Sequence, residues 1–269
     1  MVRSLALGGG GTRGGLHLGA LQALEDWKGD LVFPDGIYGA SAGAFLAVAI
    51  AFGMKLEAIR VMYDKYFTLS KFLPEPTLDH ALTAFERRGM FSMETLMTLV
   101  VTMFQEQGID LRGKRCCDAQ QPLYIVASNM TTGYPTLLTG RVSVLDALRC
   151  SSAIPVVFEP QLLYGDVYLD AGVHLRCLGT IVPKETMVIH ISGGVTKITP
   201  KSTLPEILFA CYSGRASSYF GPNICRIRKV SFGILGELTQ ADREYLVWEG
   251  YSQTRAFLTK FAGKELPKS

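Results

Sequence analysis

The chain has 269 residues, 48% of them hydrophobic and 19% charged, so it is long enough to bury a sizeable core. Its formal net charge of +3 is too small to indicate a nucleic-acid partner. The N-terminus lacks the pattern of a secretory signal, and no segment reaches the ~18 uncharged apolar residues of a membrane span. We therefore expect a cytoplasmic protein with one domain over residues 1–262 and a polar tail over 263–269. The six cysteines lack metal-ligand spacing, which indicates reduced thiols and no metal site.

Patterns typical of strands and helices alternate along the chain. We expect strands at residues 4–8, 37–40, 122–130, 135–140, 167–172, 186–194 and 226–235. We expect helices at residues 12–27, 42–52, 55–67, 92–107, 204–220 and 239–261, a short helix beginning at 144, and a proline-containing loop at 70–76. This alternation indicates the α/β class with a mostly parallel central sheet.

One short motif combines a serine with small neighbours. The stretch "GASAG", residues 39–43, matches the G-x-S-x-G pattern and lies between an expected strand and an expected apolar helix. A serine on such a tight turn projects its hydroxyl clear of the sheet, which suits a nucleophile. The alternative is that Ser41 only caps the following helix.

A nucleophilic serine needs a base, and five residues are candidates for that role. His17 falls inside the first helix, His80 in a polar region, and His190 in a buried strand. His174 follows "LDAGV" and is the histidine nearest to a strand end with an acid. Asp170 ends the apolar run "VYL", and an acid at the carboxyl end of a parallel strand lies where open α/β sheets bind ligands. The alternative for Asp170 is an acid that caps a turn.

The glycine-rich stretch "GGGTRG", residues 9–14, admits two interpretations. It matches the dinucleotide pattern G-x-G-x-x-G, but the second strand ends in "GASAG" and offers no acid for a ribose. A phosphate-binding P-loop is excluded because no Gly-Lys-Ser/Thr occurs. The remaining interpretation is a loop of amides beside Ser41 that holds a developing oxyanion. Arg13 would add a positive charge suited to a phosphate-bearing substrate, unless it is an ordinary surface arginine.

Several motifs in order resemble the patatin-like phospholipase family. "LALGGGGTRGGLHLGAL" resembles the family's glycine-rich oxyanion motif, and "YGASAGAF" resembles its nucleophile elbow. "LYIVASNMTTG" and "ALRCSSAIPVVFEP" resemble the segments that precede the catalytic acid, and "VYLDAG" falls where the family carries its Asp-Gly-Gly or Asp-Gly-Ala motif. The resemblance covers most of the chain.

The resemblance implies a three-layer α/β/α fold and a lipid acyl hydrolase with a Ser-Asp dyad and no cofactor. Ser41 would be the nucleophile and Asp170 the base, and the partner would be a lipid or a membrane surface. The glycines it assigns are Gly9, Gly10 and Gly11 for the oxyanion hole, Gly39 and Gly43 for the elbow, and Gly14 and Gly172 for the shape of their motifs.

One departure from the family pattern leaves alternatives open. Ala171 stands where the family usually has glycine, and an alanine there would be strained by roughly 1 kcal/mol or more if the position required a positive φ. A catalytically impaired, lipid-binding relative is therefore one alternative. His174 as the base and a nucleotide-binding protein are two others.

A methionine- and phenylalanine-rich stretch suggests a separate hypothesis of peripheral membrane contact. Its residues would form a lid or an interfacial patch, or else belong to the core. They are Phe72, Leu73, Met90, Phe91, Met93, Met97 and Met103.

Overall fold

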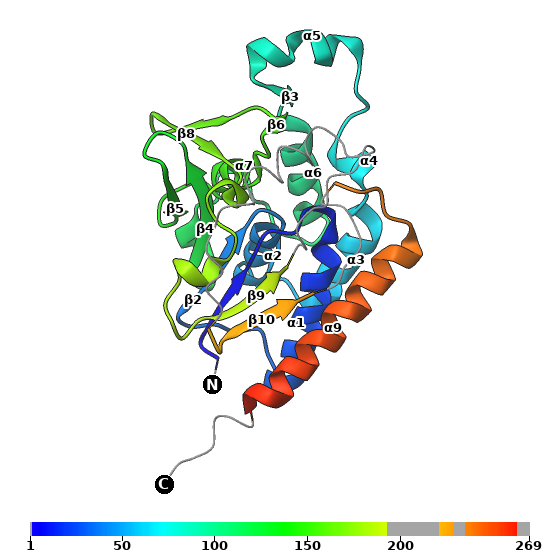
Figure 1. Cartoon of the computed structure of the whole chain (residues 1–269), viewed down its shortest axis with the longest axis vertical. Coiled ribbons are helices and arrows are strands. Elements are labelled where there is room, and N and C mark those ends of the chain that lie inside the picture. The colour runs from blue at the N-terminus through cyan, green and yellow to red at the C-terminus, as the bar shows by residue number, and fades with distance from the viewer. Residues whose placement is uncertain (1, 193–220, 229–234, 263–269) are drawn as a thin grey trace.

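A mixed, mostly parallel sheet forms the centre of the molecule (Figure 1). The computed structural model describes residues 2–192, 221–228 and 235–262. Within them the sheet has the strand order β10-β9-β1-β2-β4-β8-β7, and β5 also pairs with β4. The strands are β1 (Ser4–Leu7), β2 (Gly36–Ala40), β4 (Leu123–Asn129), β5 (Tyr134–Leu138), β7 (Gln161–Leu163), β8 (Asp166–Leu169), β9 (Met187–Ile191) and β10 (Ile224–Ile227). The pairings from β10 to β4 are parallel, whereas β5, β8 and β7 join antiparallel.

The parallel strands consist almost entirely of apolar residues, because side chains on both faces of the sheet are buried. Alternate side chains such as Leu5 and Ile37 enter the larger core, which they share with the main helices. The intervening side chains, such as Ala6 and Tyr38, pack in a second core against residues 171–182. The alternation of side chains thus supplies both cores from the same strands.

The helices of the described residues mostly cover the face with the larger core, and α9 lies along α1 (Figure 1). They are α1 (Gly15–Lys28), α2 (Ala42–Ala51), α3 (Leu56–Tyr66), α4 (Leu69–Phe72), α5 (Leu78–Arg87), α6 (Glu94–Gln105), α7 (Val144–Ser152) and α9 (Gln240–Ala262). Short 3-10 turns are η1 (Gly11–Gly14), η2 (Cys116–Asp118), η3 (Ala171–Val173) and η4 (Leu178–Thr180). None of the helices in these ranges is long and apolar enough to cross a bilayer.

The α/β class and the mostly parallel sheet are confirmed, and several local expectations need correction. The first helix begins as the turn η1, and the expected loop at 70–76 contains α4. The helix α5 and a small parallel pair, β3 (Gly89–Phe91) with β6 (Val156–Phe158), were not expected. The helix expected at 204–220 lies outside the described residues, and the last strand begins at Ile224.

Candidate active site

Ser41 occupies a strained turn between β2 and α2. Its φ of 50° and ψ of −126° are unusual for a residue with a side chain. The turn is tight because the start of α2 packs against the end of β1: a Cβ on Gly43 would collide with the carbonyl of Leu7. A Cβ on Gly39 would lie 2.6 Å from Cα of Ala44. The two elbow glycines therefore have a steric reason for their positions.

Ser151 connects the elbow to the neighbouring strand. Its hydroxyl donates to the Val126 carbonyl at 2.6 Å and accepts the Ser41 amide at 2.9 Å. Ser151 is fully buried, so these bonds are shielded from water. The backbone of Ser41 is thereby tied to β4 by a side chain that the sequence did not single out.

Asp170 reaches the turn at Ser41 from the end of an antiparallel strand, not from a parallel one. Its strand, β8, runs antiparallel to β4, with Leu169 opposite Ser128. Ala40 of β2 pairs with Val126 of the same β4. Ser41, which follows β2, and Asp170, which follows β8, therefore lie at a similar height along β4. The expectation that Asp170 ends a parallel strand is therefore wrong, but the short antiparallel strand still brings it to the carboxyl end of β2.

The carboxyl group of Asp170 is almost completely removed from water. The residue is 3% exposed, and burial raises its pKa to about 6. The nearby Ser41 hydroxyl and the Gly172 amide act in the opposite direction, the amide by donating to Oδ1 at 2.7 Å. Oδ2 has no hydrogen-bond partner among the described residues. Ser41 therefore lies close enough to the carboxyl group to influence its pKa.

Ala171 adopts an ordinary backbone conformation. It begins the turn η3, is buried, and does not have a positive φ. The substitution of alanine for the family's usual glycine therefore introduces no backbone strain here.

The glycine loop lies directly beside the elbow. A Cβ on Gly9 would approach Cβ of Ser41 to 3.4 Å. Gly10 is the N-cap of η1 and Gly11 its first residue, and the first amides of a helical turn have no acceptor within it. Gly14 follows in the same turn, where a Cβ would collide with the ring of Phe67. The loop thus offers backbone amides near Ser41 with little steric shielding.

Two buried basic side chains form hydrogen bonds with backbone carbonyls of this glycine-rich segment. His17 is fully buried, and its Nε2 lies 2.7 Å from the Gly8 carbonyl. Burial lowers the pKa of His17 to about 4, so the ring is neutral and donates this hydrogen bond. Arg13 is 6% exposed, its Nε donates to the Gly10 carbonyl, and burial lowers its pKa to about 10. Arg13 is therefore not a surface arginine, and its contact with a substrate stays a prediction.

His80 and His174 do not join the site. His80 caps α5, where it contacts the Thr77 side chain and the ring of Phe91. The backbone amide of His174 donates to Ser128, and within the described ranges its ring forms no hydrogen bond with Ser41 or Asp170. Those ranges also hold no cluster of side chains able to bind a metal ion.

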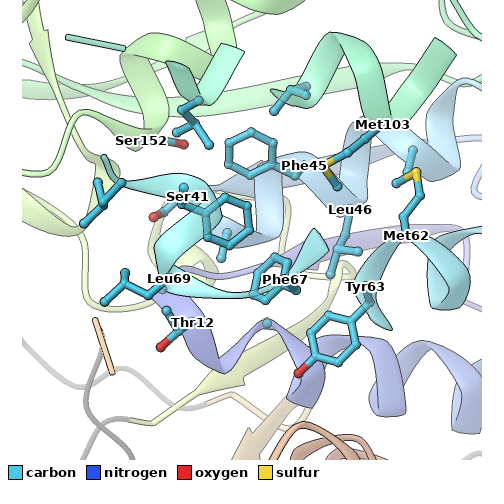
Figure 2. Close-up of a pocket in the computed structure, with 18 of the residues that line it drawn as sticks. Thr12, Ser41, Phe45, Leu46, Met62, Tyr63, Phe67, Leu69, Met103 and Ser152 are labelled. Atoms are coloured by element: carbon cyan, nitrogen blue, oxygen red, sulfur yellow. The ribbon is translucent and has the colours of Figure 1, made fainter. Parts of the chain in front are cut away.

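An apolar pocket opens onto Ser41 (Figure 2). It encloses about 1030 Å³ of empty space, part of which is open to solvent. Ser41, Ser152 and Thr12 lie at one end, and Met62 and Met103 lie toward the other. The Ser152 hydroxyl is buried and has no partner in the part of the chain that the structure describes. The pocket therefore has a polar end at the serine and an apolar body formed by α2, α3, α4 and α6.

Comparison with known proteins identifies the family. A model of the patatin-like phospholipases matches residues 5–176, and the chain belongs to this family. The chain is 26% identical over 178 residues to an uncharacterized protein of Acanthamoeba polyphaga mimivirus, covering 64% of this chain and 58% of that one. It is 25% identical over 181 residues to a cUMP-AMP-activated phospholipase of Escherichia coli, covering 61% and 50%. It thus spans about half the length of the curated relatives that it matches.

Solved structures show the same fold at low sequence identity. VipD from Legionella pneumophila matches with a TM-score of 0.55 and 16% identity, over 97% of this chain and 67% of that chain. ExoU of Pseudomonas aeruginosa, in complex with SpcU, matches with a TM-score of 0.53 and 14% identity, over 97% and 52%.

Proposed function

We propose that the chain is a lipid acyl hydrolase of the phospholipase A type, with Ser41 as nucleophile and Asp170 as general base. The observation that carries the proposal is the apolar pocket ending at a strained serine, with a buried carboxyl group beside it. An ester carbonyl would sit at the polar end, and its acyl chain would extend toward Met62 and Met103.

The reaction would proceed through an acyl-enzyme. Oγ of Ser41 attacks the carbonyl carbon while its proton passes to the Asp170 carboxylate. Amides of Gly9, Gly10 and Gly11 stabilise the tetrahedral oxyanion. The intermediate collapses, the ester bond breaks, and the alcohol leaves with the proton from Asp170. Water then attacks the acyl-enzyme with Asp170 again accepting a proton, and the fatty acid leaves as Ser41 recovers its hydrogen.

The raised pKa of Asp170 supports its assignment as the base. A carboxyl group with a pKa of about 6 is ionised at neutral pH, yet it binds a proton far better than an exposed aspartate. A general base works best when its pKa lies close to the working pH.

The pocket predicts a preference for long acyl chains. Each additional buried methylene contributes about 0.8 kcal/mol, so KM should fall roughly fourfold per methylene until the pocket is full. The test is hydrolysis of an ester series of increasing chain length by the wild type, Ser41→Ala and Asp170→Asn. Hydrolysis that survives in Ser41→Ala would exclude the nucleophile assignment, and lipid capture without turnover by the wild type would favour an impaired, lipid-binding relative.

A further inference from the structure

The helix α5 exposes an apolar stripe that the fold does not bury. Leu78, Leu82 and Phe85 lie at i, i+4 and i+7, which places them on one face of the helix. They are 77%, 70% and 93% exposed. Isolated exposed leucines are common, but three large apolar side chains along one face indicate an interaction surface.

The opposite face of α5 attaches the helix to the molecule. His80 packs edge-on against the ring of Phe91 in β3, and Ala84 and Arg87 on the same side are partly buried. A capping box between Thr77 and His80 fixes the start of the helix. The helix is therefore held on one side, and Figure 1 shows it standing away from the body with the other side open.

The segments that come before and after α5 in the chain both line the pocket. Immediately before α5, Leu69 and Phe72 of α4 line the pocket, and Leu73 lines it in the connection. Immediately after the β3 strand, Leu96 and Val100 of α6 line the pocket again. The arm that carries α5 thus leaves from one wall of the pocket and returns to another.

We propose that this stripe is an interfacial anchor that docks the protein on a lipid surface, with the pocket facing the membrane. This inference rests on the proposed lipid substrate. The methionines suggested by the sequence do not provide such a patch. Met93, Met97 and Met103 are 0%, 2% and 8% exposed and belong to the core, and Met90 is partly buried against it.

Charge and area favour a neutral lipid surface over other partners. Residues 69–91, which run from α4 through α5 to β3, contain three basic residues, Lys71, Arg87 and Arg88, balanced by the three acids Glu75, Asp79 and Glu86. The apolar stripe has no basic residue within it, so docking would depend on burial of apolar side chains and little on anionic headgroups. Three side chains also offer far less than the roughly 800 Å² per partner of a stable protein dimer.

The test measures partition of the full chain onto phosphatidylcholine vesicles. Ser41→Ala serves as the parent, so that no lipid is hydrolysed during the measurement. We expect Leu82→Gln/Phe85→Gln in this parent to weaken partition by ~10-fold or more, because two large apolar side chains are lost from the lipid. Glutamine keeps the helix propensity of α5. Partition should change little between low and high salt.

A matched control removes exposed apolar side chains elsewhere. Val32→Gln/Trp248→Gln replaces residues that are 51% and 61% exposed, and it should bind vesicles like the parent. Unchanged partition of the Leu82→Gln/Phe85→Gln variant would overturn the proposal, as would a parent that does not bind vesicles. Stripe-dependent dimerisation in the absence of lipid would overturn it too.

Hydrolysis of a water-soluble butyrate ester separates this proposal from the catalytic one. With Ser41 intact, Leu82→Gln/Phe85→Gln should hydrolyse that ester at the wild-type rate. A wild type that binds vesicles but hydrolyses neither this ester nor the longer esters of the chain-length series would contradict the proposed reaction and leave the anchor standing.

Discussion

Asp170→Asn should remove catalysis and stabilise the folded chain at neutral pH. The wild-type carboxyl group is 3% exposed, and its pKa rises from the ordinary 3.8 to about 6 because burial disfavours the charged form. The folded protein therefore binds the proton more tightly than the unfolded chain does. Stability is lost as pH rises between these two values, and it stays low above about pH 6.

The size of the effect follows from the shift. Two pKa units correspond to about 3 kcal/mol of destabilisation near pH 8. Asparagine is neutral, has the same shape, and can still accept the Gly172 amide at Oδ1. Its NH₂ group would replace Oδ2, which has no partner among the described residues, and burying it costs about 1 kcal/mol. The expected net gain is therefore about 2 kcal/mol near pH 8, and below about pH 4, where the wild-type carboxyl group is protonated, it should become a loss of about 1 kcal/mol.

Urea unfolding of both proteins over a pH series would measure this difference. His17 and His190, whose pKa values burial lowers to about 4, titrate in both proteins and cancel from the comparison. An Asp170→Asn variant that is no more stable than the wild type near pH 8 would refute the assignment of a strongly desolvated carboxylate.

Three further predictions concern the groups around Ser41 and Asp170. The kcat/KM for a water-soluble ester should rise with pH with a midpoint near 6, because Asp170 must be ionised, and a flat profile down to about pH 4 would contradict a carboxylate base. Ser151→Ala should lower the unfolding free energy by about 2 kcal/mol and reduce kcat, whereas Thr254→Val, which alters a buried hydroxyl outside the candidate site, should leave kcat unchanged. His17→Leu should reduce kcat more than KM because the Gly8 carbonyl loses its donor, and equal rates in His17→Leu and His17→Gln, which retains a donor, would argue against that positioning role.

The parts of the site that depend on local chemistry could be predicted from the sequence. "GASAG" between a strand and an apolar helix indicates a strained elbow, and Ser41 has that conformation. The glycine loop follows the first strand, so a parallel β1-β2 pair places it beside the elbow. Both features depend on residues that are close in the sequence or on neighbouring strands, so the sequence alone is enough to predict them.

The parts that depend on long-range pairing could not be predicted. Nothing in "VYLD" shows that its strand runs antiparallel to β4, because direction depends on the hairpin with β7. Ser151 lies in a run of small residues, and its two hydrogen bonds join segments 110 and 25 residues away. The helix α5 has a capping box and an apolar face, but neither feature shows that the opposite face packs against Phe91 and leaves the apolar one exposed.

The most direct test of the account is to locate the covalent adduct of a fluorophosphonate. The reagent phosphonylates an activated serine, and peptide mass spectrometry identifies which one. We predict an adduct on Ser41, none at any position in Ser41→Ala, and much slower labelling in Asp170→Asn. An adduct on Ser152, the other serine at the polar end of the pocket, or labelling that persists in Ser41→Ala would contradict it.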